Sequence, residues 1–273
     1  MMNRLFVAML IVAASAPGLS AQRQAPEAAL LQERRDHATY LRDGPTNPHE
    51  AVAHQPVGTG LTLGPASTDI PLTRLARHEI LVSGRRVSVR EPNGKVTPLP
   101  RGKALPIESG FFLLLRGTSV RPVLTVFGNG PAHASTPTWF APDPAQIDTV
   151  VLQPPKAPTP LTLLDADGVD VAAAEAGTVV LSGGETLRVR RLATGEDESE
   201  LELFFRDATN GRDTYPAGRF LTVVPLRDGR YVLDFNRARN PSCAYNTVFP
   251  CPAPWPGNAL RRPIRAGERY KAK

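Results

Sequence analysis

The stretch TVVLSGGETLRVRRLATGEDESELELFFR (residues 178–206) decides the fold. Apolar residues alternate with polar ones on both sides of Gly183-Gly184 and of Gly195-Glu196-Asp197, which is the pattern of half-buried strands joined by tight turns. Connections this short cannot contain crossover helices, so neighbouring strands must run antiparallel. The stretch therefore predicts three antiparallel strands, over residues 178–182, 185–192 and 200–206.

The same pattern of short apolar runs and turn residues extends in both directions from this stretch. It predicts further strands over residues 78–82, 86–90, 111–115, 120–127, 147–152, 161–164, 219–226 and 230–236. Only residues 25–42 are rich enough in helix formers to predict a helix, which Gly44-Pro45 ends. The expected fold is therefore mainly β, with antiparallel sheets that form a sandwich or a partly open barrel and with one N-terminal helix.

Breaks in the pattern divide the chain into four predicted regions. These are a signal peptide (1–21), an N-terminal helix (22–46), an N-terminal β lobe (47–142) and a C-terminal β lobe that ends in an irregular, proline-rich tail (143–273). The 273 residues include 28 prolines and 22 glycines, which favours many short strands over long helices.

The N-terminus has the features of a cleavable secretory signal. Arg4 precedes the apolar run Leu5 to Ala16, which is too short to span a bilayer, and Leu19-Ser20-Ala21 offers small residues to the peptidase. We expect cleavage after Ala21, with an earlier cut after Ala16 as the alternative. No cysteine lies near the cut, so the sequence predicts an exported protein, periplasmic or secreted, that is not a lipoprotein and keeps no transmembrane segment.

The charge of the chain favours solubility over nucleic-acid binding. The formal net charge is +6, but the basic residues are spread along the chain, except for a group near its end. That group is Arg261, Arg262, Arg265, Arg269, Lys271 and Lys273. Because an exported protein rarely meets nucleic acid, we expect a solvated face here and no nucleic-acid partner.

Cys243 and Cys251 are the only cysteines. An even number of cysteines in an exported chain favours a disulfide. All five histidines lie between His37 and His133, so none is near Cys243 in sequence to act as a base for a catalytic thiol. The same distribution argues against zinc, because zinc sites need clusters of histidine or cysteine. We therefore predict a Cys243–Cys251 disulfide and no metal.

Several segments resemble the DUF1684 family, a bacterial and archaeal family of unknown function. The resemblance is strongest over residues 200–268, in FFRDATNGRDTYPAGRFL (204–221), YVLDFNRARNPSCAYN (231–246), CPAP (251–254) and NALRRPIRAGE (258–268). TWFAPDP (138–144) and ERRDHATYLRDGP (33–45) are similar to its aromatic-rich segment and its N-terminal helix. Pro216, Arg239 and Ser242 depart from the usual family residues, and the resemblance implies no activity.

A second resemblance concerns the N-terminal β lobe. Residues 61–95 resemble the β pattern of the phosphopeptide-binding forkhead-associated sandwich. The arginine and serine that hold the phosphate in that family are not found at the matching places. The resemblance therefore implies a similar β pattern without the phosphate-binding function.

Polar residues at the expected strand ends of the C-terminal lobe are the candidates for a site. The catalytic candidates are Asp213, Asp234 and Tyr215, and the ligand-binding candidates are Arg206, Arg219, Asn236 and Arg237. If segments 204–221 and 231–240 pair, Arg219 would come close to Asp234 or Asn236. Guanidinium groups bind carboxylates and phosphates, and carboxylates act as acids or bases. The alternative is a buried polar network that satisfies irregular backbone.

Two functions remain open, with a third less favoured. The first is a non-catalytic extracytoplasmic protein that binds a small or polymeric ligand, an anion among the options, or an envelope component. The second is an enzyme of hydrolase type, using Asp234 or Asp213 with the arginines. The third is a flavin-holding barrel, which no residue pattern demands. The sequence contains no nucleophile elbow, P-loop, dinucleotide fingerprint or metalloprotease helix, so we expect no cofactor.

Overall fold

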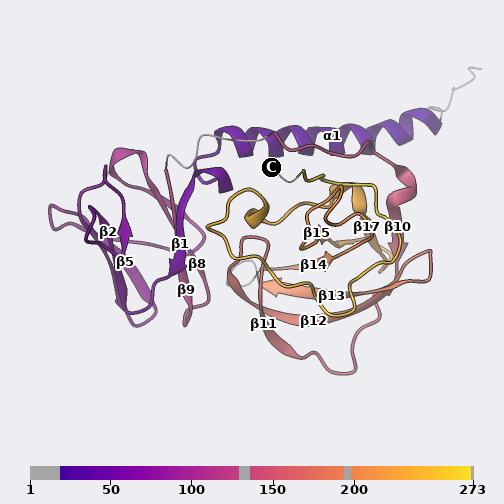
Figure 1. Cartoon of the computed structure of the whole chain (residues 1–273). Helices are drawn as coiled ribbons and strands as arrows, with labels where there is room; N and C mark the ends of the chain where they lie inside the picture. Colours follow the sequence, from indigo (N-terminus) through magenta and orange to yellow (C-terminus); the bar gives the residue numbers. More distant parts are fainter. Residues whose placement is uncertain (1–18, 129–135, 194–197, 272–273) are drawn as a thin grey trace, which may run out of the picture.

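Two β lobes lie side by side, and one long helix runs along the second lobe (Figure 1). The structure is a computed structural model that describes residues 19–128, 136–193 and 198–271, with side chains from residue 27 onward. The chain is mainly β and its described part contains no closed barrel, which confirms the predicted fold class. Residues 1–18 of the expected signal and the expected turn at 195–197 lie outside the described residues.

The helix α1 spans Leu19–Asp43, so the expected cleavage point after Ala21 falls within it. Leu30, Arg34 and Leu41 are buried at helical spacing, which places one stripe of the helix against the lobe. Gly44 ends the helix as predicted: its N–H donates to Tyr40 O at 2.8 Å. A Cβ at Gly44 would lie 2.5 Å from the Tyr40 ring, so only glycine fits this close approach.

The N-terminal lobe is a sandwich of two sheets. The first sheet has the order β1 (Ala51–Pro56), β9 (Pro122–Phe127), β8 (Phe112–Gly117), β7 (Ala104–Pro106). The second has the order β3 (Ile70–Pro71), β2 (Gly60–Gly64), β4 (His78–Ser83), β5 (Arg86–Arg90), β6 (Val96–Pro98). Leu63, Ile80 and Val89 from the second sheet pack with Leu113 and Leu124 from the first in one core.

The predicted hairpin in this lobe is confirmed, and the lobe also contains a short parallel pair of strands. β4 and β5 pair antiparallel from Glu79↔Arg90 to Ser83↔Arg86, with Gly84 at a φ of 61° in the turn. The short strands β2 and β3, which the sequence analysis did not predict, pair in parallel. The Asp69 carboxylate accepts hydrogen bonds from the Thr62 N–H and hydroxyl, which fastens the short connection that makes this pairing possible.

The C-terminal lobe also packs two sheets face to face. The larger has the order β11 (Pro160–Leu164), β12 (Asp170–Val180), β13 (Thr186–Ala193), β14 (Ser199–Phe205), β15 (Arg219–Thr222). The smaller has the order β10 (Ile147–Val150), β17 (Tyr231–Asp234), β16 (Val224–Pro225). Leu187 and Leu203 of the larger sheet, Leu233 of the smaller and Ile264 of the tail are fully buried in the core they share.

Two predicted strands of this lobe differ in extent from the structure. The strand expected over 219–226 is divided at Val223. The Val223 N–H still donates to Leu201 O on β14 of the larger sheet, whereas β16, which follows it, belongs to the smaller sheet. The strand expected over 178–182 is the end of β12, which begins eight residues earlier, at Asp170. Its alanine-rich first half has weak β propensity, and pairing with strands on both sides makes it extended.

Ion pairs join the two lobes. Arg116 on β8 donates to both Asp165, at 2.6 Å, and Asp167 in the β11–β12 turn, and Arg121 donates to Asp170 at 3.0 Å. His54 on β1 lies 3.3 Å from Gly168 O in the same turn. The turn is therefore one place at which the C-terminal lobe holds the N-terminal lobe, and Asn246, which donates to Pro48 O and Ala51 O, is another. Among the described residues, no helix is long and apolar enough to cross a membrane.

We expect Leu233→Ala to lower the free energy of unfolding by about 3 kcal/mol, because it removes a fully buried side chain between the two sheets of the C-terminal lobe. Val224→Ala, on the neighbouring strand β16 and 46% exposed, is the matched control and should change stability by less than about 0.5 kcal/mol. Urea unfolding measures both. Equal effects of the two substitutions would contradict this account of the core.

Candidate functional site

The polar residues predicted from the sequence do not form one site. The structure separates them into a buried pair around Arg219, a cluster around Asp234 at helix α1, and a region near the disulfide that contains Tyr215. Arg206 belongs to none of these, because its side chain is exposed and its backbone pairs with Ala259 of the tail.

Arg219 is fully buried and binds the tail, not the residues expected. Its Nη2 donates to Asp207 Oδ2 at 2.9 Å and to Ile264 O at 3.0 Å, and its Nη1 donates to Ala266 O. Arg219 makes no hydrogen bond or ion pair with Asp234 or Asn236, contrary to expectation. Segments 204–221 and 231–240 meet at the backbone bridge between Phe220 and Arg239 and in the ring contact of Phe205 with Phe235, and the tail binds the Arg219 guanidinium. Burial lowers the pKa of Arg219 while Asp207 raises it.

Asp207 has several internal partners besides Arg219, whereas the buried Nε of Arg219 has no hydrogen-bond partner among the described residues. Its Oδ1 accepts hydrogen bonds from the Thr209 N–H at 2.8 Å, the Thr209 hydroxyl at 2.6 Å and the Ile264 N–H at 3.1 Å. Neither side chain of the Arg219–Asp207 pair is exposed. A charge pair with this many internal partners fixes the tail to the sheet, and no described face of it is open to a ligand.

Three of the predicted residues do come together, beside helix α1. Asp234 accepts hydrogen bonds from Arg237 at 3.0 Å and from the Asn236 N–H at 3.0 Å, and Arg237 also donates to Glu33 of α1. Asn236 exchanges hydrogen bonds with the Asp143 backbone, both at 2.9 Å. The cluster therefore ties α1 and the segment before β10 to the end of β17.

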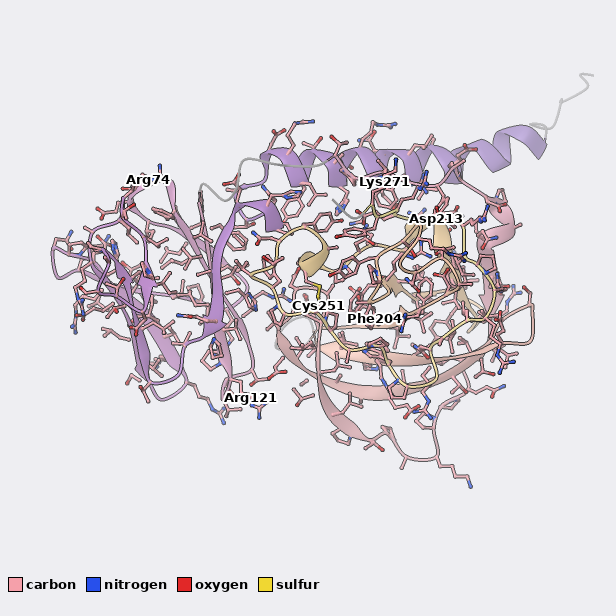
Figure 2. The ribbon with its side chains drawn as sticks, viewed as in Figure 1. Arg74, Arg121, Phe204, Asp213, Cys251 and Lys271 are labelled. Carbon is pink, nitrogen blue, oxygen red and sulfur yellow. A yellow bond between two sulfur atoms is a disulfide. The ribbon has the colours of Figure 1, made fainter. Side chains whose placement is uncertain are left out.

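Tyr215 and Asp213 lie near the disulfide and the tail. Cys243 and Cys251 are bonded, as predicted, and Figure 2 shows Cys251 near the boundary between the lobes. The Tyr215 hydroxyl lies 3.4 Å from Cys243 Sγ and 3.2 Å from Cys251 Sγ. Asp213 is 3.6 Å from Arg269. Tyr215 thus packs against the disulfide rather than facing an open pocket with Asp213.

The sequence analysis missed a hydrogen-bonded chain that joins α1 to the tail. Arg239 Nη1 lies 3.5 Å from His37 Nδ1, His37 Nε2 lies 3.3 Å from the Tyr245 hydroxyl, and that hydroxyl donates to Glu268 Oε1 at 2.5 Å. Glu268 Oε2 accepts the Asn240 N–H at 3.0 Å. Because Arg239 can only donate, His37 accepts at Nδ1 and carries its proton on Nε2, so every member of the chain has a matching partner.

Burial decides the protonation of this chain. The Glu268 side chain is 1% exposed, and burial raises the pKa of its carboxyl to about 7. Burial, with a contribution from Arg239, lowers the pKa of His37 to about 4. Burial also raises the pKa of Tyr245 well above its usual value, so this phenol is not activated as a nucleophile. The arrangement therefore anchors α1 to the tail.

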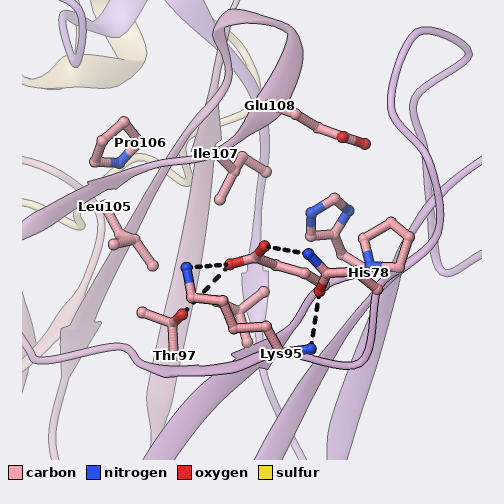
Figure 3. Close-up of a pocket in the computed structure, with 11 residues that line it drawn as sticks. His78, Lys95, Thr97, Leu105, Pro106, Ile107 and Glu108 are labelled. Atoms are coloured by element: carbon pink, nitrogen blue, oxygen red, sulfur yellow. Dashed lines mark hydrogen bonds and ion pairs between the residues drawn. The ribbon is translucent and has the colours of Figure 1, made fainter.

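A cavity of about 360 Å³ lies in the N-terminal lobe, away from all of these residues (Figure 3). It opens between β6 and β7, and its polar lining includes His78, Glu91, Lys95 and Glu108. The described residues contain no group of three or more histidine, cysteine, aspartate or glutamate side chains that could hold a metal ion. The sequence analysis named no residue of this cavity as a candidate.

A comparison with known protein families finds a match in the C-terminal half of the chain. The model of the DUF1684 family, described as a protein of unknown function, matches residues 135–269. The chain belongs to the DUF1684 family. An uncharacterized protein of Haloarcula marismortui, solved in solution by NMR, is 33% identical, over 50% of this chain and 76% of that chain, with a TM-score of 0.42. No curated protein matches this DUF1684 chain.

The contributions of Glu268 and His37 to the free energy of unfolding should depend on pH in opposite directions. Folded Glu268 keeps its proton where the unfolded chain has lost it, so its contribution is full below about pH 4.5 and is lost as the pH rises to about 7. Folded His37 stays neutral where the unfolded chain is charged, so its contribution is full above about pH 6.5 and is lost as the pH falls to about 4.

We therefore expect Glu268→Gln to become more stable relative to the unsubstituted protein as the pH rises from 4.5 to 7. The unsubstituted protein loses the stabilising contribution of protonated Glu268 over this range, whereas the variant has no such contribution to lose. The total change should be of the order of 3 kcal/mol. Urea unfolding at four pH values measures it. Glu27→Gln, on the exposed part of α1, is the control and should show no such trend. A pH-independent difference for Glu268→Gln would overturn the assignment.

Proposed function

We propose that this DUF1684 protein is exported and acts outside the cytoplasm as a non-catalytic binding protein. In this proposal the C-terminal lobe is a scaffold, and ligand is bound in the cavity of the N-terminal lobe. The observation that carries the proposal is that most polar candidates of the DUF1684 segments bind one another or backbone, with the exposed Arg206 as an exception. We infer that ligand binding uses other residues.

The hydrolase alternative has less support. It needs Asp213, Asp234, Arg219 and Tyr215 around one open pocket. Arg219 instead binds Asp207 and tail carbonyls, Asp234 binds Arg237, and Tyr215 packs against the disulfide. A general acid or base must lie within hydrogen-bond reach of a reacting group, and these side chains are committed to separate partners.

Export is supported by the sequence of residues 1–21 and by the disulfide, since disulfides persist in oxidising compartments. We expect the full-length chain, expressed in a bacterial host, to appear in the periplasm or medium with Gln22 at its N-terminus. Neither Cys243 nor Cys251 should react with iodoacetamide before reduction. Mass spectrometry reads both results, and a chain lacking residues 2–21 is the control. Retention of the full-length chain in the cytoplasm, or two reactive thiols, would contradict the proposal.

Binding without turnover is the second expectation. In a thermal-shift screen of residues 22–273 against sugars, nucleotides, anionic lipids and amines, at least one class should raise Tm, and the shift should grow with the logarithm of its concentration above Kd. NMR should detect no product from that compound. Asp234→Asn should lower Tm, because it weakens the pair with Arg237, yet leave the ligand-induced shift unchanged. Product formation that Asp234→Asn abolishes would establish the hydrolase alternative instead.

A further inference from the structure

The cavity of the N-terminal lobe lies at the open side of its sandwich. β6 is the last strand of one sheet and β7 is the last strand of the other, and the cavity lies between them. Its volume of about 360 Å³ falls within the range of small-molecule sites. Leu105 and Ile107 form an apolar wall on the β7 side, and Val89 of β5 adds to the apolar lining.

The strand edges beside the cavity are poorly suited to pairing with another strand. β6 ends at Pro98 and β7 ends at Pro106, and each strand has only three residues. Proline lacks the N–H that a sheet ladder needs, and natural edges are blocked in this way. The cavity is therefore better suited to a small molecule or a single side chain than to an added peptide strand.

One end of the cavity presents hydrogen-bond acceptors, and Ala76 positions two of them. His78 Nδ1 lies 2.9 Å from Ala76 O, and the Ala76 N–H donates to Glu108 Oε1 at 3.1 Å. A carbonyl only accepts, so His78 donates from Nδ1, and Nε2 is the ring nitrogen left to accept. Figure 3 shows His78 and Glu108 at the same end of the cavity.

The other end of the cavity is nearly neutral. Lys95 Nζ lies 3.2 Å from Glu91 Oε1, and this contact lowers the pKa of Glu91. The Thr97 hydroxyl and the Asn93 amide lie 3.4 Å from the same carboxylate. Among the described residues, no Lys, Arg or His nitrogen lies within 4.0 Å of the Glu108 carboxylate, so Glu108 supplies the uncompensated charge of the cavity.

The loop that carries Glu108 has an unusual backbone. Ser109 has a φ of 60°, and it is the one residue other than glycine with a positive φ in the described part of the chain. Such conformations cost free energy and occur more often at ligand sites. This conformation turns the chain sharply directly after Glu108, between the end of β7 and the start of β8.

We propose that this cavity binds an aliphatic ammonium group, such as a primary alkylamine or the side chain of a lysine. The ammonium donates to Glu108 and to His78 Nε2, and the alkyl chain lies against Leu105 and Ile107. This inference rests on the proposed binding function and names its ligand class. A phosphate or carboxylate would instead meet the Glu108 carboxylate, which repels it.

The test is an NMR titration of ¹⁵N-labelled residues 22–273 with pentylamine at pH 7, where the amine is charged. Pentanol and pentanoate are the matched probes for the alkyl chain and for opposite charge. We expect saturable shifts from pentylamine at the amides of Thr97, Leu105 and Glu108, with binding at least about tenfold weaker for pentanol and pentanoate.

Glu108→Gln should weaken pentylamine binding by about tenfold or more, because it removes the charged acceptor. Glu108 is exposed, so this variant should fold, which its Tm verifies. The control is Glu198→Gln, an exposed carboxylate of the C-terminal lobe, which should bind pentylamine unchanged. Equal binding of pentanol, or unchanged binding by Glu108→Gln, would overturn the proposal.

The two proposals fail in different ways. If pentylamine does not bind but another class in the thermal-shift screen does, the ammonium assignment is wrong and the binding function stands. If no class binds, both are wrong. If pentylamine shifts only amides of the C-terminal lobe, the cavity is not the site.

Discussion

The burial of Arg219 is the constraint on which the C-terminal lobe depends. Its guanidinium lies between β15 and the tail, donating to Asp207 and to the carbonyls of Ile264 and Ala266. Removing one partner of a buried pair leaves an uncompensated charge, which costs about 3–5 kcal/mol. This penalty keeps the tail carbonyls beside the Arg219 guanidinium. The irregular tail is therefore part of the core, where Ile264 and Ala266 are fully buried.

The local part of this fold could be predicted from the sequence, and the long-range part could not. Alternation and turn residues located most strands to within a few residues, including the hairpin of β4 and β5. Alternation failed at residues 170–177 of β12, where alanine and Gly177 have weak β propensity and neighbouring strands impose the extended form. It also failed at Val223, where the chain passes between sheets without a turn signal.

The candidate residues show the same division. The disulfide followed from cysteine count alone, and Asp234, Asn236 and Arg237 are close in space because they are close in sequence. The chain from His37 to Glu268 joins residues 231 positions apart, so no spacing rule could find it. Its residues nevertheless lie in segments that carry the DUF1684 resemblance, which was the available signal. The cavity of the N-terminal lobe depends on two sheet edges that only the assembled sandwich brings together.

The position of the Arg219 partners has a consequence for how the chain matures. A growing chain that has emerged only as far as β17 already contains Arg219 but lacks Ile264, Ala266 and Glu268. Until those residues arrive, the guanidinium lacks the tail carbonyls and α1 lacks the acid at the end of its hydrogen-bonded chain. Closure of this lobe is therefore a late event in synthesis. Late closure would suit the proposed export, because a polypeptide passes through a translocation channel before it acquires its tertiary structure.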